Sequence, residues 1–597
     1  MTMRSDCVRR NVVDRGGGTF CVLAGAGAFT IAVSILAGSV AFGDETEKPS
    51  DANTPRPRLT LSREVTFFTE PLAADGLVDY AAALNARYGK GVTPENNAAV
   101  VLVNAVGRRD ADYEKFASLC KRLGIEPVPE HGQYFVRFDR FVFDLGERYD
   151  RDPDAAAKRI GLKRDVLGEL LKKPIDFSET LERCQQIPWT GSDEPLLDAW
   201  LKHIETPLDQ CVSGSERPQF YVPLESGAGI DGLLRPDGIS FSVLSIAQAL
   251  TVRAMRHCAE SRLEASWNDI LAARRWAHRV AEGGMVIDHM LGMAARRQAS
   301  AAAIGLLVYG NASRDQIERM ARGWREASAD MPLVECFETT ERTFSLEAMN
   351  AVFRGTQAAY PEFSPSVSSK LRALRSHRYP RWVTTAAIDW DAAFRSINVV
   401  HDELERISRL ATRRARLRAL EEMNERADRR GRPINAAAML LSITTLEFPA
   451  QRKAVGQLLG TIVASQLRPV MNSVITVDQQ RNTEYGLVPV IFGLTRYRAA
   501  RGEYPKSLDQ LVPAFLEAVP ADDFGDGPLK YKRRDDGGFE LYSVGVNGRD
   551  DGGATAQPLV DTTSIADAEE SDDDVMAQED DPEKPDDLVI RVGAPRK

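Results

Sequence analysis

At 597 residues the chain is too long for a single hydrophobic core, and a soft expectation of about 150 residues per domain gives three or four units. Its 43% hydrophobic and 27% charged residues are an ordinary globular composition. The net charge of −10 comes from residues 561–587, which hold 13 Asp or Glu and one Lys, so the rest of the chain is close to neutral at +2 and its charge says little about a substrate.

A long uncharged segment stands near the N-terminus. Residues 16–43 carry no charged side chain, while four arginines precede them and Asp44 follows. The run is about long enough to span a bilayer as a helix, and basic residues before it predict that the body lies outside the cytoplasm. Residues 39–41, Ser-Val-Ala, form a small-residue cleavage site. Residues 1–43 are therefore predicted to be either a cleaved signal peptide or a retained membrane anchor.

A polar, proline-containing segment at residues 44–60 is a predicted linker. Beyond it, residues 61–235 are predicted to form an N-terminal region that is mostly helical. Residues 76–92 show the apolar spacing of a helix that ends in glycines. In the next predicted helix, 93–107, Thr93 is expected to be the N-cap residue.

Residues 236–470 are predicted to be an array of helices. Apolar side chains recur at three- and four-residue steps in four successive segments: 239–262, 266–283, 284–310 and 313–327. Ser266 is expected to cap the second of them. Helices of this length joined by short turns indicate an antiparallel array or a solenoid-like stack of helix pairs. After a proline-containing stretch at 353–382, the helical pattern resumes.

The pattern changes to mixed α and β near the C-terminal end. Residues 471–555 contain the end of a helix, a turn with a short second helix, and two runs of β-forming residues at 529–534 and 539–544. The Asp-Asp-Gly-Gly sequence at 535–538 supplies the turn that a hairpin between them needs. The remaining residues, 556–597, are rich in acids and are predicted to be a disordered tail.

Three sequence elements in this region carry a resemblance to a known family: RGEYPKSLDQLVP (501–513), AVPADDFGDGPLKY (518–531) and FELYSVGVNGRDDGG (539–553). Their order resembles the periplasmic head of the major pseudopilin of type II secretion systems, over about residues 485–553. The chain lacks that family's Gly-Phe-Thr-Leu-Ile-Glu processing sequence, so the resemblance implies a reused head domain rather than a pilus subunit. Residues 69–107, together with this unit, also look like a family of uncharacterised exported bacterial proteins.

The resemblance also implies a calcium site. In the pseudopilin family the final loop binds calcium through backbone carbonyls near the end of the last strand and through acids of the loop. The matching positions here are Leu541 and Ser543 in the strand and Asn547, Asp550 and Asp551 in the loop. Asn547 stands where the family has aspartate, and calcium needs six to eight oxygen ligands. Two interpretations therefore stay open, a calcium site and a solvated turn.

No catalytic motif stands out in the sequence. There is no G-x-S-x-G elbow, Walker loop or dinucleotide fingerprint. His401 and Glu405 are expected to be an exposed pair on a helix, and Asp522 and its acidic neighbours to be turn residues. The arginine-rich stretch 406–432 is expected to be a solvated helix face rather than a nucleic-acid site, because no aromatic residues are interleaved. The five cysteines beyond the leader show no CxxC spacing, and buried free thiols are favoured over the alternative of one or two disulfide bridges.

The sequence thus predicts a mainly α fold, a helical array or solenoid-like body with a small C-terminal α+β domain like a pseudopilin head. The favoured function is that of an exported or membrane-anchored, non-enzymatic interaction or scaffold component of the cell envelope. Its partners would be envelope or secretion proteins, with the membrane contacted through the N-terminal segment and no nucleic acid. The alternative is a hydrolase-like envelope enzyme whose site is assembled from distant residues. A deep pocket with convergent acids or histidines would favour that alternative.

Overall fold

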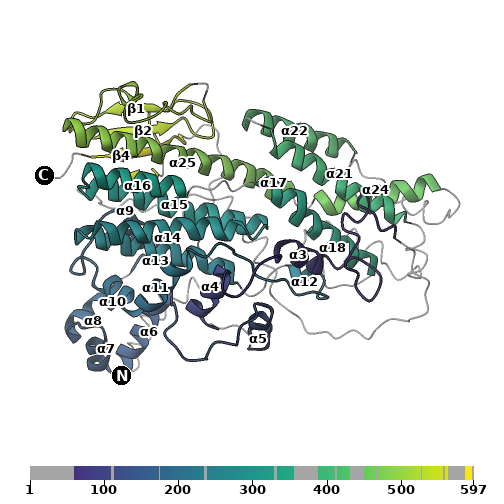
Figure 1. Ribbon diagram of the computed structural model, residues 1–597, viewed down its shortest axis with the longest axis horizontal. Coiled ribbons are helices and arrows are strands. Elements are labelled where there is room, and N and C mark those ends of the chain that lie inside the picture. Colours follow the sequence, from purple (N-terminus) through teal and green to yellow (C-terminus); the bar gives the residue numbers. More distant parts are fainter. Residues whose placement is uncertain are drawn as a thin grey trace.

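The chain folds into helices for most of its length, with a small sheet close to its C-terminal end (Figure 1). The computed structural model describes residues 59–593 except for 109–112, 174, 234–237, 328–332, 355–387, 411–412, 431–448, 466–467, 526, 556–557 and 562–584. The predicted leader, almost all of the linker and nearly all of the proline-containing stretch lie outside the described residues. Within them, no helix has the length and apolar character to cross a membrane.

The N-terminal region is a series of short helices: α3 (Tyr80–Tyr88), α4 (Ala98–Val106), α5 (Tyr113–Arg122), α6 (Phe138–Arg151), α7 (Pro153–Arg159), α8 (Arg164–Lys172), α9 (Phe177–Gln186), α10 (Pro195–His203) and α11 (Glu205–Gly214). Local sequence explains their ends. Asp152 caps α7 by accepting a hydrogen bond from the backbone N–H of Ala155, and Pro153 occupies the first helical position. Phe138, Phe141 and Leu145 of α6 bury one face of that helix at three- and four-residue steps.

Four helices follow the short α12 (Ile230–Leu233) and form the centre of what we call the first lobe: α13 (Ile239–Ala259), α14 (Leu263–Ala281), α15 (Val286–Tyr309) and α16 (Arg314–Glu326). α13, α14 and α15 pack against one another across short turns, and α16 packs against α14 and against the later helix at residues 468–501 (Figure 1). Glycines let α15 approach its neighbours closely. A Cβ at Gly305 would lie 2.2 Å from the carbonyl oxygen of Gln186 in α9, and one at Gly292 would lie 2.6 Å from that of Ala277 in α14. The prediction of a mainly helical body is therefore confirmed.

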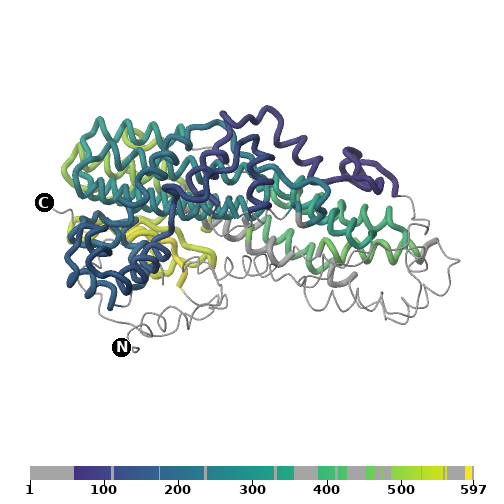
Figure 2. The backbone as a smooth tube through the Cα atoms, turned by 90° about the horizontal axis from the view of Figure 1, so that it is seen from below, coloured from purple at the N-terminus to yellow at the C-terminus, as the bar shows by residue number. Residues whose placement is uncertain are grey.

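A second lobe lies at the other end of the elongated molecule (Figure 2). It contains α17 (Leu333–Glu335), the π-helical turn η1 (Cys336–Thr340), α18 (Glu341–Arg354), α21 (Trp390–Ser408), α22 (Arg413–Arg430) and α24 (Pro449–Ser465). α24 packs against α21 through Gly456 and Gly460, where a Cβ would lie 2.1 Å and 2.0 Å from backbone oxygens of α21 and its cap. α18, α21 and α24 share a hydrophobic core of their own, to which α3 also contributes, while the buried apolar residues of α17, η1 and α22 belong to the core of the first lobe.

The helix α25 (Arg468–Arg501) connects the two lobes (Figure 1). Its 34 residues correspond to a length of about 50 Å. Phe492 of α25 meets Trp267 of α14 and Trp324 of α16, with ring centroids 6.1 Å and 6.4 Å away. The helix begins before residue 471, so the C-terminal unit starts inside an element that also belongs to the array. The helix ends at Gly502, whose φ of +83° suits glycine.

The sheet has the order β1-β2-β4-β3 and follows the short 3₁₀ helix η2 (Leu508–Leu511). Its strands are β1 (Lys530–Arg533), β2 (Phe539–Ser543), β3 (Val560–Asp561) and β4 (Leu588–Val592). β1 and β2 form the predicted antiparallel hairpin, and Gly537 in its turn has φ +85°. Phe539 packs its ring 4.7 Å from that of Tyr504, so the sheet is buried against the end of α25. A helix followed by a hairpin is thus present between residues 485 and 553.

The prediction of a disordered tail at 556–597 is wrong for the residues that form strands. β4 pairs with the central strand β2 in antiparallel register, with Leu541 opposite Ile590, and β3 pairs with β4 in parallel. The physical reason is visible in the sequence Leu-Val-Ile-Arg-Val at 588–592, whose β-branched side chains are almost all buried in the sheet. High acidity in the preceding residues concealed this strand.

Two predicted helix caps are also wrong. α4 is capped by Asn97 instead of Thr93, because the Asn97 side chain both accepts from the Ala99 N–H and bonds the backbone of Tyr221. α14 begins at Leu263, and Ser266 is buried within its first turn. At α4 the cap depends on the contact between Asn97 and the distant Tyr221, which local sequence cannot reveal.

The prediction that His401 is exposed is wrong, because the structure buries this side chain completely. Its Nε2 lies 3.0 Å from the Ser345 Oγ of α18, while Glu405 pairs with Arg409 one turn further along α21. Asp522, in contrast, is a turn residue as predicted: its carboxylate accepts from the N–H groups of Phe524 and Val544 and thereby fastens the turn to the end of β2. The five cysteines of the described residues are free and buried, which confirms that prediction.

Candidate functional site

The predicted calcium ligands fall into two groups. Leu541 and Ser543 lie in β2, between β1 and β4, and the Ser543 hydroxyl donates a 2.6 Å hydrogen bond to Asp522. Asn547, Asp550 and Asp551 lie together in the loop that follows, which we call the acidic loop (residues 545–553). The Asn547 amide donates to the Asp551 carboxylate at 2.9 Å, so the structure brings these two residues into contact, whereas Asp550 bonds the Tyr542 hydroxyl.

Two acids that the sequence interpretation had assigned to the tail also reach the acidic loop. Asp586 accepts from the N–H of Asn547 at 3.0 Å, and Asp587 accepts from the N–H of Gly553 at 2.7 Å. Burial raises the pKa of Asp587, the Gly553 N–H opposes this, and the nearby carboxylates of Asp551 and Asp550 raise it further. The loop is therefore crowded with negative charge just where β4 enters the sheet.

The fit of a cation to this loop is incomplete in the arrangement described. Most of the carboxylate oxygens already accept hydrogen bonds, such as those from the Tyr542 hydroxyl and the Gly552 N–H to Asp550. Lys530 also pairs with Asp550 at 3.5 Å. Among the described residues, no group of three or more His, Cys, Asp or Glu side chains is placed to hold a metal ion. Calcium binding at the acidic loop stays a prediction.

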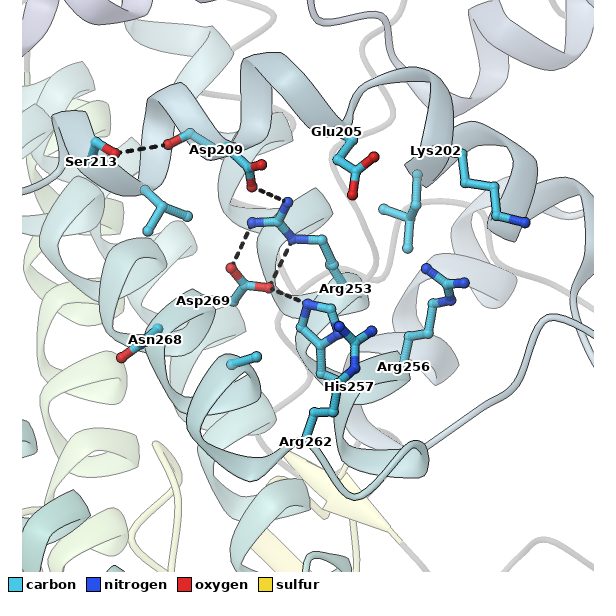
Figure 3. Close-up of a pocket in the computed structure, with 13 residues that line it drawn as sticks. Lys202, Glu205, Asp209, Ser213, Arg253, Arg256, His257, Arg262, Asn268 and Asp269 are labelled. Carbon is cyan, nitrogen blue, oxygen red and sulfur yellow. Dashed lines mark hydrogen bonds and ion pairs between the residues drawn. The ribbon is translucent and has the colours of Figure 1, made fainter.

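A second candidate site lies in the first lobe and was not found from the sequence. It is an open cleft of about 450 Å³ between α10 and α11 on one side and α13 and α14 on the other, which we call the α11 cleft (Figure 3). Its lining is mainly charged: Lys202, Glu205, Asp209, Arg253, Arg256, His257, Arg262 and Asp269, with Ser213, Asn268 and three apolar residues. Its volume lies in the range of small-ligand sites.

Arg253 occupies the centre of the α11 cleft, and its side chain is only 9% exposed. Its Nε and Nη2 donate to the two oxygens of Asp269 at 2.9 Å and 2.7 Å, and its Nη1 donates to Asp209 at 2.7 Å (Figure 3). Burial alone would lower the pKa of Arg253, but attraction to Asp269 and the hydrogen bonds to both acids outweigh burial and raise it. The guanidinium is therefore a permanently charged group held in a fixed orientation.

His257 lies beside this ion pair, one helical turn beyond Arg253. Its Nε2 is 3.6 Å from the Asp269 carboxylate. Burial, and then the positive charges of Arg262 and Arg253, lower the pKa of His257 to about 4. The imidazole is consequently neutral at pH 7. A group with this pKa is a weak proton acceptor at physiological pH.

The remaining cations of the cleft wall are paired too. Arg256 contacts Asp198 at 2.6 Å, and Lys202 contacts the other oxygen of Asp198 at 2.8 Å. Arg262 hydrogen-bonds Glu260, with the Nε–oxygen distance at 2.8 Å. The cleft thus presents a set of ion pairs, some buried and some in contact with water.

A second hollow, of about 590 Å³, adjoins the first across the Asp209–Ser213 edge of α11 and lies against α4. Asp209 and Ser213 line both hollows, so this edge of α11 separates them. The second hollow also contains Arg217, which donates from Nη1 to the backbone oxygens of Pro94 and Asn97. Together the two hollows make a broad, polar surface around one helix.

The sequence contained a partial signal for the α11 cleft. Arg253 interrupts the apolar run of α13, and a charge in a buried helix face needs a partner. The partners, Asp209 and Asp269, lie 44 and 16 residues away on other helices, and no motif connects them. In comparisons with known proteins, no family model, curated protein or solved structure matched this chain.

Proposed function

We propose that this protein is a non-enzymatic interaction protein of the cell envelope, whose first lobe binds a partner in the α11 cleft. In this proposal residues 1–43 carry the chain out of the cytoplasm, either as a cleaved signal peptide or as an anchor. The C-terminal unit is a reused pseudopilin-like head that follows the helical body. The partners are envelope or secretion proteins.

The observation that carries the proposal is the pairing of charges in the α11 cleft. Each of the four cations that line the cleft has a carboxylate partner, and Arg253 is held in place by two of them. Fixed, oriented charges at the base of an open cleft favour recognition, because they set the position and sign of the groups that a partner must present. A cleft open to water on one side also accommodates a segment of a larger molecule.

The alternative, a hydrolase-like enzyme, has one observation in its favour, which is the approach of His257 to Asp269 inside the cleft. Three features weigh against it. The pKa of His257, at about 4, lies far below the range in which a general base works at neutral pH. Both carboxylate oxygens of Asp269 already accept hydrogen bonds from Arg253. Ser213, the hydroxyl that lines the cleft, donates its proton to the backbone oxygen of Asp209.

The pseudopilin-like part of the proposal rests on the order of elements from α25 to the acidic loop. A helix, a short turn with η2, and a hairpin occur in the order that the resemblance implies. If calcium binds, Asp550 and Asp551 of the acidic loop and Asp587 before β4 would hold it. The ion would then supply positive charge that ties the loop to the last strand.

The test is fractionation of cells that make the full chain, followed by capture of its partners from solubilised envelope membranes. Ser213 is exposed on α11, so Ser213→Trp fills the cleft without touching the buried Arg253–Asp269 pair. Ser178, exposed on α9, provides the matched control Ser178→Trp. We expect the envelope fraction to contain the protein, and its partner to be lost with Ser213→Trp alone. A cytoplasmic protein with residue 1 intact would contradict the proposal, and so would equal capture by both variants.

A further inference from the structure

In the α11 cleft, Arg253 makes two ion pairs that differ in their exposure to water. Arg253 is bound on one side by Asp269, whose side chain is 4% exposed, and on the other by Asp209, whose side chain is 65% exposed. The bond to Asp269 is buried and made with two donors, so it fixes the plane of the guanidinium. The bond to Asp209 is made at the edge of the cleft, with a single donor at 2.7 Å.

These two bonds differ in how easily they exchange. Removing Asp269 would leave a buried charge without compensation, which is strongly unfavourable. Asp209 is in contact with water, and ion pairs of exposed side chains contribute little to stability. An incoming carboxylate can therefore take the place of Asp209 on Arg253 Nη1, while the pair with Asp269 stays intact.

Asp209 has a place to move when it is displaced. Its side chain lines both the α11 cleft and the second hollow on the other side of α11. Arg217 lines that second hollow, so a displaced carboxylate would move toward positive charge. The exchange needs only a rotation of one exposed side chain.

The exchange conserves the charge around Arg253. The lining contains four permanent cations, Lys202, Arg253, Arg256 and Arg262, against the acids Glu205, Asp209 and Asp269, and the wall cations also pair with Asp198 and Glu260 just outside it. His257 is neutral at pH 7. The balance of these groups, −1, becomes 0 when the Asp209 carboxylate turns away, and an incoming carboxylate restores it. Lys202, with 63% of its side chain exposed, adds a second donor at the rim.

We propose that the α11 cleft binds a carboxylate of an acidic peptide segment, which Arg253 takes in exchange for Asp209. This inference rests on the proposed function and names the chemistry of the partner. A peptide fits the size of the cleft, about 450 Å³, and its open side lets the rest of the chain continue outward. Asp or Glu side chains and a C-terminal carboxylate share this chemistry.

The experiment measures binding of fluorescent peptides to the purified full chain. The probes are an acetylated and amidated tetraglutamate, a tetraglutamine with a free C-terminal carboxylate, a tetraglutamine without one, and inorganic phosphate as a competitor. We expect binding of the first or the second, which separates side-chain from terminal carboxylates, and none of the third. We also expect weaker binding as salt is raised, because charges drive the encounter. Lys202→Gln should weaken the binding of the carboxylate peptide about two- to threefold.

The decisive comparison uses two variants of the same helix. Asp209→Asn removes the negative charge of the internal competitor and should tighten peptide binding about three- to fivefold, the size expected from loss of an exposed ion pair. Glu205→Gln also removes a negative charge from the lining but frees no donor of Arg253. It should change the affinity less than about 1.5-fold. Equal tightening by both variants would overturn the exchange, since general attraction would then suffice.

The outcomes separate the ligand class from the proposed function. Absence of carboxylate peptide binding to both wild type and Asp209→Asn would overturn the ligand class, even if Ser213→Trp still abolished partner capture. Phosphate that competes while the carboxylate peptides fail to bind would overturn it as well. Peptide binding by a chain found in the cytoplasm would instead support the site and contradict the envelope function.

Discussion

His401 allows a quantitative test of the second lobe. It is fully buried in α21 and lies against Ser345 of α18. Burial, and then the positive charge of Arg342, lower its pKa from 6.5 to about 3. The unfolded chain therefore takes up a proton below pH 6.5, whereas the folded chain does not until about pH 3. Stability that is fully present above pH 6.5 is lost as the pH falls through this interval.

The magnitude follows from the two pKa values. In the unfolded chain the pKa of His401 is 6.5, so pH 5 lies about 1.5 pH units below it. Proton uptake by the unfolded chain then lowers the stability by about 2 kcal/mol relative to pH 8. His401→Gln removes this proton uptake. The variant is expected to be less stable than wild type at pH 8, because it disturbs a buried contact, but to lose about 2 kcal/mol less between pH 8 and pH 5.

The assay is urea unfolding at both pH values, followed by proteolytic cleavage within α21 so that the second lobe reports its own unfolding. The control is His131→Gln, since His131 is exposed to water in a loop of the first lobe. It should leave the pH dependence of α21 unchanged. If wild type and His401→Gln lost the same free energy between pH 8 and pH 5, the account of a buried neutral imidazole would be refuted.

Three further predictions concern other parts of the chain. Burial raises the pKa of Glu341 to about 7, so the unfolded chain releases this proton at lower pH than the folded chain does. The unfolding free energy of the second lobe should therefore fall by about 3 kcal/mol as the pH rises from about 4.5 to 8. Glu341→Gln should remove most of that fall in the same urea assay. Calcium at a hundredfold excess over its dissociation constant should raise the unfolding free energy by about 2.7 kcal/mol; no change at millimolar calcium, or an unchanged rise in Asp551→Ala, would exclude the acidic loop as the site. Ile590 is fully buried in β4, so Ile590→Ala should cost about 2–5 kcal/mol in thermal unfolding; a neutral effect would mean that the last strand is not part of the core.

The helices were predictable where the pattern was local and long. The apolar spacing of residues 239–310 gave the three central helices, and Gly310, the last residue of the predicted segment 284–310, directly follows the end of α15. The hairpin of β1 and β2 followed from its turn residues. In these segments the local preference and the tertiary environment agree, which is why one sequence suffices to identify them.

The errors have a common physical cause, which is contact between distant residues. Asn97 caps α4 because Tyr221 holds it in place, and His401 is buried because α18 packs over it. β4 joins the sheet although an acidic stretch precedes it, since the buried face of 588–592 outweighs the local composition. The Asn97 contact leaves no periodic signal in the sequence, whereas His401 does fall on the periodic apolar face of α21, in line with Ile397 and Leu404.

The candidate site was less predictable than the fold. The loop residues Asn547, Asp550 and Asp551 were found because a resemblance indicated them, and the structure added Asp586 and Asp587. The α11 cleft was missed entirely, because its charges come from α10, α11, α13 and α14. Such a site exists only after the helices have packed.

The central claim is that the α11 cleft holds a partner in the cell envelope. A photoreactive amino acid placed at Ser213 in living cells tests it directly, with the same substitution at Ser178 on α9 for comparison. Our account predicts a discrete crosslinked product from position 213 in the envelope fraction, absent from position 178 and diminished by excess tetraglutamate peptide in permeabilised cells. Identical products from the two positions, or none from position 213, would contradict it.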